Sequence, residues 1–218
     1  MYFLDRAHAA QLLAERLIHT SGDHPLVLGI PRGSVPMAKE LADRLGGDLD
    51  VVLVHKIGAP ENPEFAIGSV SEFGTLYRSP VFDYYETSQG YLDSAVQEEI
   101  AKLKKRRQTY SGIHPPIDPE GRTVIIVDDG IATGATMLAA VRAIRLQKPG
   151  KIIVASPVAS VDAAELLRSE ADELMILDTP EPFYAISQFY GEFAQVSDDE
   201  VNAILRESGR GAKPKRVA

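Results

Sequence analysis

The stretch "VIIVDDGIATGATM", residues 124–137, decides the fold of this chain. Four apolar residues lead into Asp128 and Asp129, and a turn of Gly, Ala and Thr then leads into a helix-like sequence. A short continuous apolar run is typical of a strand that is buried on both faces. We therefore predict a strand, a loop and a helix, with two carboxylates at the carboxyl end of the strand, where open α/β sheets bind their ligands.

Four other apolar runs share the buried-strand pattern: 25–30, 50–58, 151–159 and 173–178. Helical patterns lie around them, at 6–19, 35–46, 136–147, 162–170 and 197–208. The alternation predicts an α/β fold, with a doubly wound, mainly parallel five-stranded sheet and helices on both faces. Between the second and third strands, residues 62–80 predict short strands or a hairpin, and residues 88–110 predict a helix.

Composition excludes several classes of protein. The 218 residues are 44% hydrophobic and 25% charged, which is ordinary for a soluble protein. No apolar run approaches the roughly 20 residues that span a bilayer, and the charged N-terminus does not resemble a secretory signal. The absence of cysteine excludes disulfides and thiolate metal sites and fits an intracellular protein. We therefore expect a cytoplasmic protein with no membrane partner.

The net charge argues against nucleic acid as a partner. It is −8 in total, and the tail 210–218 contributes four basic residues and no acidic one, so residues 1–209 carry −12. A body of that charge repels nucleic acid. Any polyanionic ligand must therefore be held by local positive groups or through a metal ion. We expect the basic tail, 209–218, to be disordered.

The loop "GIATGAT" has the chemistry of a phosphate site. It offers successive backbone N–H groups and two threonine hydroxyls at the start of a helix, whose N-terminus is partially positive. It is not a Walker A loop, because Gly130 and Gly134 are separated by three residues and no lysine follows Gly134. It is not G-x-G-x-x-G either, which disfavours a dinucleotide fold.

Asp128 and Asp129 accept hydrogen bonds and donate none when ionised. Beside a phosphate cradle, they suit sugar hydroxyls or the waters of a metal ion. Together with the loop they predict a site for a phosphorylated sugar. The alternative is an ordinary turn, in which Asp129 caps the helix and Asp128 is solvated.

This stretch resembles the ribose-phosphate motif of type I phosphoribosyltransferases. The resemblance implies that Asp128 and Asp129 are catalytic residues that accept from the 2′- and 3′-hydroxyls of phosphoribosyl pyrophosphate. It implies that the loop binds the 5′-phosphate, chiefly through the backbone from Ala132 to Ala135 and the two threonines. The resemblance therefore implies that the substrate-binding residues of this loop are Gly130, Ile131, Ala132, Thr133, Gly134, Ala135 and Thr136.

A second stretch, "GIPRGSVPMA", looks like the pyrophosphate loop of the same family. The resemblance implies that Arg32 contacts pyrophosphate and that the backbone of Arg32, Gly33 and Ser34 turns its N–H groups inward. It also suggests a cis peptide bond near Pro31–Arg32. Without the other motif, Arg32 would be interpreted as a solvated turn residue.

A third stretch, "VHKIGAPENPEFAIGSVSEFG", is similar in layout to the adenine-type members. Lys56 is then a candidate phosphate contact, and Glu72 a candidate acid–base residue near the acceptor. The alternatives are a strand-end charge for Lys56 and an exposed hairpin residue for Glu72. Ala132 stands where hypoxanthine/guanine-type enzymes carry aspartate, which disfavours those enzymes and leaves the adenine and orotate types open.

The family also carries an acceptor-binding hood and a mobile loop. We expect a single domain over 1–208, with the hood formed by two segments, about 1–20 and 179–205, and a flexible insertion at about 75–121. Phe183, Phe189 and Tyr190 are candidate stacking platforms, with core packing as the alternative. Lys104, Lys105, Arg106 and Arg107 could supply charge to the mobile loop. The alternative is a basic helix C-terminus.

The resemblance implies a Mg²⁺-dependent transfer of the phosphoribosyl group to a nitrogen acceptor, such as a nucleobase, with release of pyrophosphate. The metal would arrive on the substrate, with Asp128 and Asp129 reaching it through water. The five histidines have no zinc-like spacing. A regulator that binds phosphoribosyl pyrophosphate or a nucleotide without turnover is the main alternative, and a receiver-like signalling domain a more distant one. The acceptor and the oligomeric state, including a homodimer, are left open.

Overall fold

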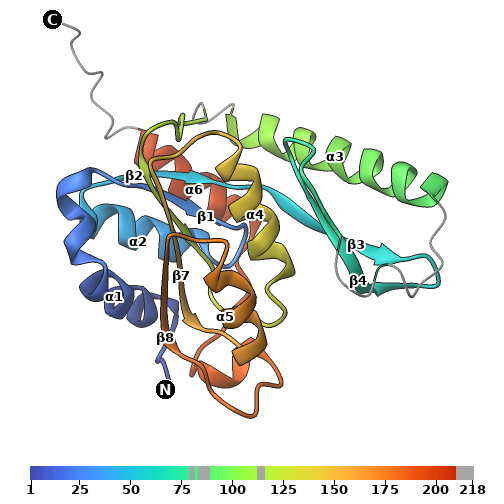
Figure 1. The fold of residues 1–218 in the computed structure, drawn as a ribbon. Coiled ribbons are helices and arrows are strands. Elements are labelled where there is room, and N and C mark those ends of the chain that lie inside the picture. The colour runs from blue at the N-terminus through green and yellow to red at the C-terminus, as the bar shows by residue number, and fades with distance from the viewer. Residues whose placement is uncertain (79–81, 83–88, 112–115, 210–218) are drawn as a thin grey trace, which may run out of the picture.

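The computed structural model describes residues 1–78, 82, 89–111 and 116–209. Five strands form one parallel sheet in the order β2-β1-β6-β7-β8 (Figure 1). Their bounds are β1 Leu26–Gly29, β2 Asp48–Val51, β6 Thr123–Val127, β7 Lys151–Val158 and β8 Glu173–Asp178. The predicted fold class is therefore confirmed. The tail predicted to be disordered lies, from residue 210 on, outside the described residues.

Helices cover both faces of this sheet. On one face lie α1 Arg6–Arg16, α2 Val35–Leu45 and α6 Asp198–Gly209, and on the other lie α4 Ala135–Arg145 and α5 Val161–Arg168. Side chains alternate along β6, so that Ile125 and Val127 enter the first core while Val124 and Ile126 enter the second. Burial on both faces explains why this strand is a continuous apolar run.

A second, antiparallel sheet projects from the first (Figure 1). It contains β3 Val54–Ala59, β4 Asn62–Ser71 and β5 Leu76–Arg78, and the 23-residue helix α3 Gln89–Ser111 packs along it. We call these three strands and α3 the arm. The arm contains the hairpin predicted within 62–80. Most of the described part of the predicted insertion belongs to β5 and α3, and its flexibility stays a prediction.

One predicted strand was wrong. Residues 50–58 do not form a single strand: β2 ends at Val51 in the parallel sheet, and β3 begins at Val54 in the arm. The link is apolar because it is buried between the two sheets, with Val52 in one core and Leu53 in the other. A continuous apolar run therefore spans two elements.

The two predicted hood segments meet in space. Phe3 forms a bridge to Tyr190, its N–H donates to the carbonyl of Phe189 at 2.8 Å, and its own carbonyl accepts from the N–H of Gly191 at 2.8 Å. The 3₁₀ helix η3 Ile186–Phe189 directly precedes Tyr190, and another 3₁₀ helix, η1 Ile18–Asp23, follows α1. Within the described ranges, no helix is long and apolar enough to cross a membrane.

The first prediction tests the core beneath the site. Ile153 on β7 is 0% exposed, whereas Ile18 is 58% exposed. Ile153→Ala should lower the free energy of unfolding by about 2–5 kcal/mol, because it leaves a cavity in the core. Ile18→Ala should change it by less than about 0.5 kcal/mol. Urea denaturation measures both, and equal effects would contradict the assigned core.

Candidate functional site

The loops after β1 and β6 meet at the carboxyl edge of the parallel sheet. A Cβ atom added to Gly33 would lie 2.4 Å from Oδ2 of Asp129, so glycine is required for this close approach. The "PRGS" loop, residues 31–34, and the paired aspartates are therefore neighbours. The peptide bond between Pro31 and Arg32 is cis, which was predicted.

Asp129 is bound by a residue that the sequence did not single out. Both Nε and Nη2 of Arg6 lie 2.8 Å from the same carboxylate oxygen of Asp129, Oδ2. The main-chain carbonyl of Asp129 accepts from the hydroxyl of Tyr190 at 2.6 Å. The residue is only 8% exposed. Its other carboxylate oxygen, Oδ1, accepts no hydrogen bond from any other described residue.

Asp128 is half-buried, and like Asp129 it has one carboxylate oxygen that is hydrogen-bonded and one that is not. Oδ1 accepts from the N–H of Asp129 at 3.0 Å, and Oδ2 has no partner among the described residues. The buried and unpartnered side-chain atoms of those residues are Nε2 of Gln147 and Oδ1 of Asn202. Oδ2 of Asp128 and Oδ1 of Asp129 are not among them, so both remain accessible acceptors at the site.

Electrostatics explain why this pair needs support. Burial raises the pKa of Asp128, and the negative charge of Asp129 raises it further. Burial also raises the pKa of Asp129, while the guanidinium of Arg6 opposes that shift. Two carboxylates side by side, with their charge disfavoured by burial, are typical of a functional site rather than of a turn chosen for stability.

The loop after the aspartates is fixed by contacts with the end of β7, with Ser160 and with η3. The N–H of Ile131 donates to the carbonyl of Val158 at 2.9 Å, and the hydroxyl of Ser160 donates to the carbonyl of Ala132 at 2.6 Å. A Cβ atom at Gly130 would meet Ile186 at 2.4 Å. These contacts fix the base of the loop against the end of β7 and η3.

The N-terminus of α4 has no side-chain cap. Gly134 is the N-cap residue, with φ of 76°, which only glycine adopts readily. Thr133 is exposed and Thr136 half-buried, and neither hydroxyl bonds to any described residue. Among the described residues, the first amide groups of α4 and the two threonine hydroxyls are therefore without partners, as a phosphate site requires.

The two side chains of the "PRGS" loop differ in their surroundings. Ser34 is buried, and its hydroxyl donates to the carbonyl of Ile30, so only its main chain faces the site. Arg32 is exposed and lies 3.6 Å from a carboxylate oxygen of Asp198 at the start of α6. At this distance and exposure the pair is weak, so the guanidinium can turn to a ligand.

Lys56 lies on the strand face that approaches the loop. It is paired with Ser69 across β3 and β4, so the two side chains share one face of the arm. The hydroxyl of Ser69 donates to the carbonyl of Ala135 at 3.0 Å, at the first residue of α4. The third predicted stretch therefore reaches the site through β4. Its role as a phosphate contact stays a prediction.

Glu72 is not at the open site. Arg107 of α3 donates to both of its carboxylate oxygens, at 2.6 Å each, and Nη1 of Arg107 also donates to Asp50 at 3.0 Å. Both carboxylates are buried. The acid–base role of Glu72 stays a prediction, but its carboxylate is bound within an internal ion cluster. Arg107 belongs to that cluster, whereas Lys104, Lys105 and Arg106 lie exposed on α3.

Two of the predicted stacking residues are core residues. Phe189 and Tyr190 are buried, and Phe183 packs against Phe189 with ring centroids 5.0 Å apart. Core packing, the alternative interpretation, therefore describes Phe189 and Tyr190.

The guanidinium of Arg6 lies 3.9 Å from the ring centroid of Phe193. A single arginine in an amphipathic helix carries no sequence signal that would have revealed this position.

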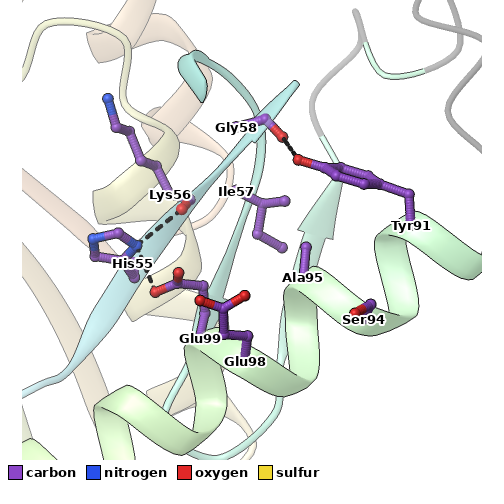
Figure 2. Close-up of a pocket in the computed structure, with 9 residues that line it drawn as sticks. All are labelled: His55, Lys56, Ile57, Gly58, Tyr91, Ser94, Ala95, Glu98 and Glu99. Atoms are coloured by element: carbon purple, nitrogen blue, oxygen red, sulfur yellow. Dashed lines mark hydrogen bonds and ion pairs between the residues drawn. The ribbon is translucent and has the colours of Figure 1, made fainter. Parts of the chain in front are cut away.

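A separate cavity of about 350 Å³ lies between β3 and α3 (Figure 2). Nδ1 of His55 lies 2.9 Å from a carboxylate oxygen of Glu99 across it, and the hydroxyl of Tyr91 donates to the carbonyl of Gly58 at 3.1 Å. The side chain of Lys56 extends away from α3, from the other face of the strand (Figure 2). This cavity is therefore distinct from the edge where the aspartates lie.

Comparison with known proteins agrees with the geometry. A family model described as "Phosphoribosyl transferase domain" matches residues 4–189, which is most of the chain. The chain therefore belongs to the phosphoribosyl transferase domain family.

Individual relatives support this membership. TT1426 from Thermus thermophilus, a crystal structure, is 45% identical with a TM-score of 0.83, over 96% of this chain and 100% of that chain. The Mycobacterium tuberculosis protein "Putative phosphoribosyl transferase Rv0571c" is 38% identical over 95% of this chain and 47% of that protein. This chain thus spans about half of that relative. "Bifunctional protein PyrR" of Chloroflexus aurantiacus is 36% identical over 58% of this chain and 65% of that protein. None of these names refers to adenine, so the adenine-type likeness stays a prediction.

The second prediction concerns the ion cluster. Arg107→Met leaves the buried carboxylates of Glu72 and Asp50 without a cation, and should lower the free energy of unfolding by about 3–5 kcal/mol. Lys105→Met on the same helix is the control, because Lys105 is exposed, and it should cost less than about 0.5 kcal/mol. Denaturant unfolding measures both. An Arg107→Met protein as stable as the control would contradict the structural role.

Proposed function

We propose that the chain transfers the 5-phosphoribosyl group of phosphoribosyl pyrophosphate to a nitrogen acceptor and releases pyrophosphate. A nucleobase is the acceptor class that we favour. One observation carries the proposal: Asp128 and Asp129 each commit one carboxylate oxygen to the protein and leave one accessible, directly before an uncapped helix N-terminus. Two neighbouring acceptors beside an anion site match a vicinal diol with a phosphate on the same sugar.

In this proposal the substrate lies along the start of α4. The 5′-phosphate accepts from the amides of residues 132–135 and from the threonine hydroxyls, where the partial positive charge of the helix favours an anion. The ribose hydroxyls donate to Oδ2 of Asp128 and Oδ1 of Asp129. The pyrophosphate lies over the "PRGS" loop, within reach of Arg32, and Lys56 approaches from the arm.

The residues of the site fit Mg²⁺ only as an ion that arrives with the substrate. Among the described residues, no group of three or more His, Asp or Glu side chains could hold a metal by itself. The accessible oxygen of Asp128 is a suitable acceptor for the waters of a hard cation. When bound, the ion would offset the charge of the departing pyrophosphate.

The reaction breaks the bond between C1 of the ribose and the pyrophosphate oxygen and forms a bond from C1 to the acceptor nitrogen, which then loses its proton. Positive charge develops on the sugar ring, and negative charge develops on the leaving group. Asp128 and Asp129 are placed to favour the first, and Arg32 with the loop amides to favour the second. The group that takes the proton from the acceptor stays unassigned.

The direct test is release of pyrophosphate from phosphoribosyl pyrophosphate and Mg²⁺ across a panel of purine and pyrimidine bases. Base-dependent release supports a transferase. Tight binding of phosphoribosyl pyrophosphate without release for any base would favour the regulator instead. Absence of binding would overturn both.

The third prediction tests the paired carboxylates. Asp128→Asn combined with Asp129→Asn should weaken the binding of phosphoribosyl pyrophosphate at least about tenfold. Each substitution replaces a charged acceptor of a ribose hydroxyl with a neutral amide. Calorimetry measures the binding, and unchanged tight binding would refute the roles.

Stability provides the control for that experiment. The raised pKa of Asp128 means that the folded chain holds its proton more tightly than the unfolded chain, so ionisation at neutral pH lowers stability. Asp128→Asn removes that charge and should not lower the midpoint of urea denaturation. A large loss of stability would show that binding was lost through unfolding.

The fourth prediction tests Arg32. Arg32→Ala should weaken pyrophosphate about tenfold and ribose 5-phosphate much less, because only the leaving group lies over the "PRGS" loop. Arg44→Ala is a matched control, since the side chains of Arg32 and Arg44 are both 44% exposed and each has one carboxylate partner. Calorimetry with the two ligands separates the effects, and equal losses for both would overturn this assignment.

A further inference from the structure

We infer that Arg6 is a positioning residue for ribose recognition: it holds one oxygen of Asp129 so that the other is presented to a sugar hydroxyl. The inference rests on the proposed function and names how the diol is recognised. Arg6 lies in α1, outside both loops of the site; its guanidinium bonds Asp129 and also lies beside Gly33 of the "PRGS" loop.

The first argument is the geometry of the ion pair. Arg142 and Glu170 pair through two donors and two oxygens, with Nε on Oε2 at 3.2 Å and Nη2 on Oε1 at 2.5 Å. Arg107 engages both oxygens of Glu72 in the same way. Arg6 instead directs Nε and Nη2 to a single oxygen of Asp129. The fork gives two bonds to two oxygens, whereas the Arg6 pair leaves the second carboxylate oxygen of Asp129 available to a ligand.

The second argument is that the guanidinium is held in place by contacts of its own. Its third nitrogen, Nη1, donates to the carbonyl of Ala194 at 2.7 Å, and its carbon lies 3.9 Å from the ring centroid of Phe193. The side chain of Arg6 is only 13% exposed. Every nitrogen therefore has a partner, and Arg6 has little freedom to follow a moving carboxylate.

The third argument is that the rest of Asp129 is also held. Its N–H donates to Asp128, its carbonyl accepts from Tyr190, and its Oδ2 lies against the backbone of Gly33. The remaining freedom is rotation of the carboxylate, and Arg6 removes it. Because pre-oriented acceptors lose less entropy on binding, this should raise affinity for the diol specifically.

The fourth argument is the origin of the contacts. Arg6 comes from the first hood segment, and Ala194 and Phe193 come from the second. One side chain therefore joins both segments to a carboxylate of the sugar site. A residue that acted only on the phosphate or pyrophosphate would have no reason to lie behind Asp129.

The experiment compares ribose 5-phosphate with 2,3-dideoxyribose 5-phosphate, which lacks the diol and keeps the phosphate. Calorimetry should give at least about a tenfold preference for ribose 5-phosphate in the unmodified protein, since hydroxyls then bond to charged acceptors. Arg6→Met should reduce that preference to nearly one. Its affinity for pyrophosphate should change much less than that preference, although the guanidinium also lies beside Gly33.

Two further variants keep the test decisive. Arg6→Lys retains the charge but lacks the planar group that bonds both Asp129 and Ala194. Its preference for ribose 5-phosphate should therefore lie between that of the unmodified protein and that of Arg6→Met. It serves as the test if Arg6→Met fails to fold. Arg145→Met is the control for the bonding pattern, because Arg145 also bonds one aspartate, Asp172, and one carbonyl, that of Glu170, although its side chain is 41% exposed and that of Arg6 is 13% exposed. It should keep the full preference.

The outcomes separate this inference from the proposed function. If the unmodified protein binds neither sugar phosphate, the proposed function fails and the inference with it. If the unmodified protein prefers ribose 5-phosphate and a folded Arg6 variant keeps the same preference, the function stands and the role of Arg6 is overturned. A preference lost in both Arg6→Met and Arg145→Met would assign the effect to general destabilisation and overturn it as well.

Discussion

Burial of two adjacent carboxylates is the constraint on which the site depends. Asp128 and Asp129 follow a strand covered on both faces, where the low dielectric and their mutual repulsion oppose ionisation. One cation, Arg6, binds Asp129, and one main-chain donor, the N–H of Asp129, binds Asp128. Each satisfies one oxygen, which leaves one acceptor per residue for a ligand. The arrangement costs stability and creates a binding site, which is the usual relation between the two.

The arm is joined to this edge through contacts of two kinds. Arg107 connects α3 to Glu72 and Asp50 in a buried cluster, which fixes where the arm leaves the parallel sheet. Ser69 connects β4 to the start of α4. Together these contacts fix the strand face that carries Lys56 relative to the phosphate loop. The cavity between β3 and α3 lies on the opposite side of that strand from the amino group of Lys56 (Figure 2).

Family membership and function rest on different observations. The family match and the similarity to TT1426 cover nearly the whole chain. Catalysis and the identity of the acceptor depend on the site itself, because one fold can carry several functions. The chain spans about half of the mycobacterial relative, so the activity of a complete protein of that length does not follow from this domain.

The sequence by itself determined four of the five parallel strands, the two glycine loops and the paired aspartates, because apolar runs, turn residues and one long motif are local signals. The cis bond at Pro31–Arg32 was implied only by the resemblance to the family. Only the tertiary structure decided that residues 50–58 divide between two sheets, because a buried strand and a buried link between two sheets both give an apolar run in the sequence. It also decided the partners of Asp129 and Glu72. Arg6 lies 123 positions from Asp129 and Arg107 lies 35 from Glu72, and no local pattern encodes contacts over such separations.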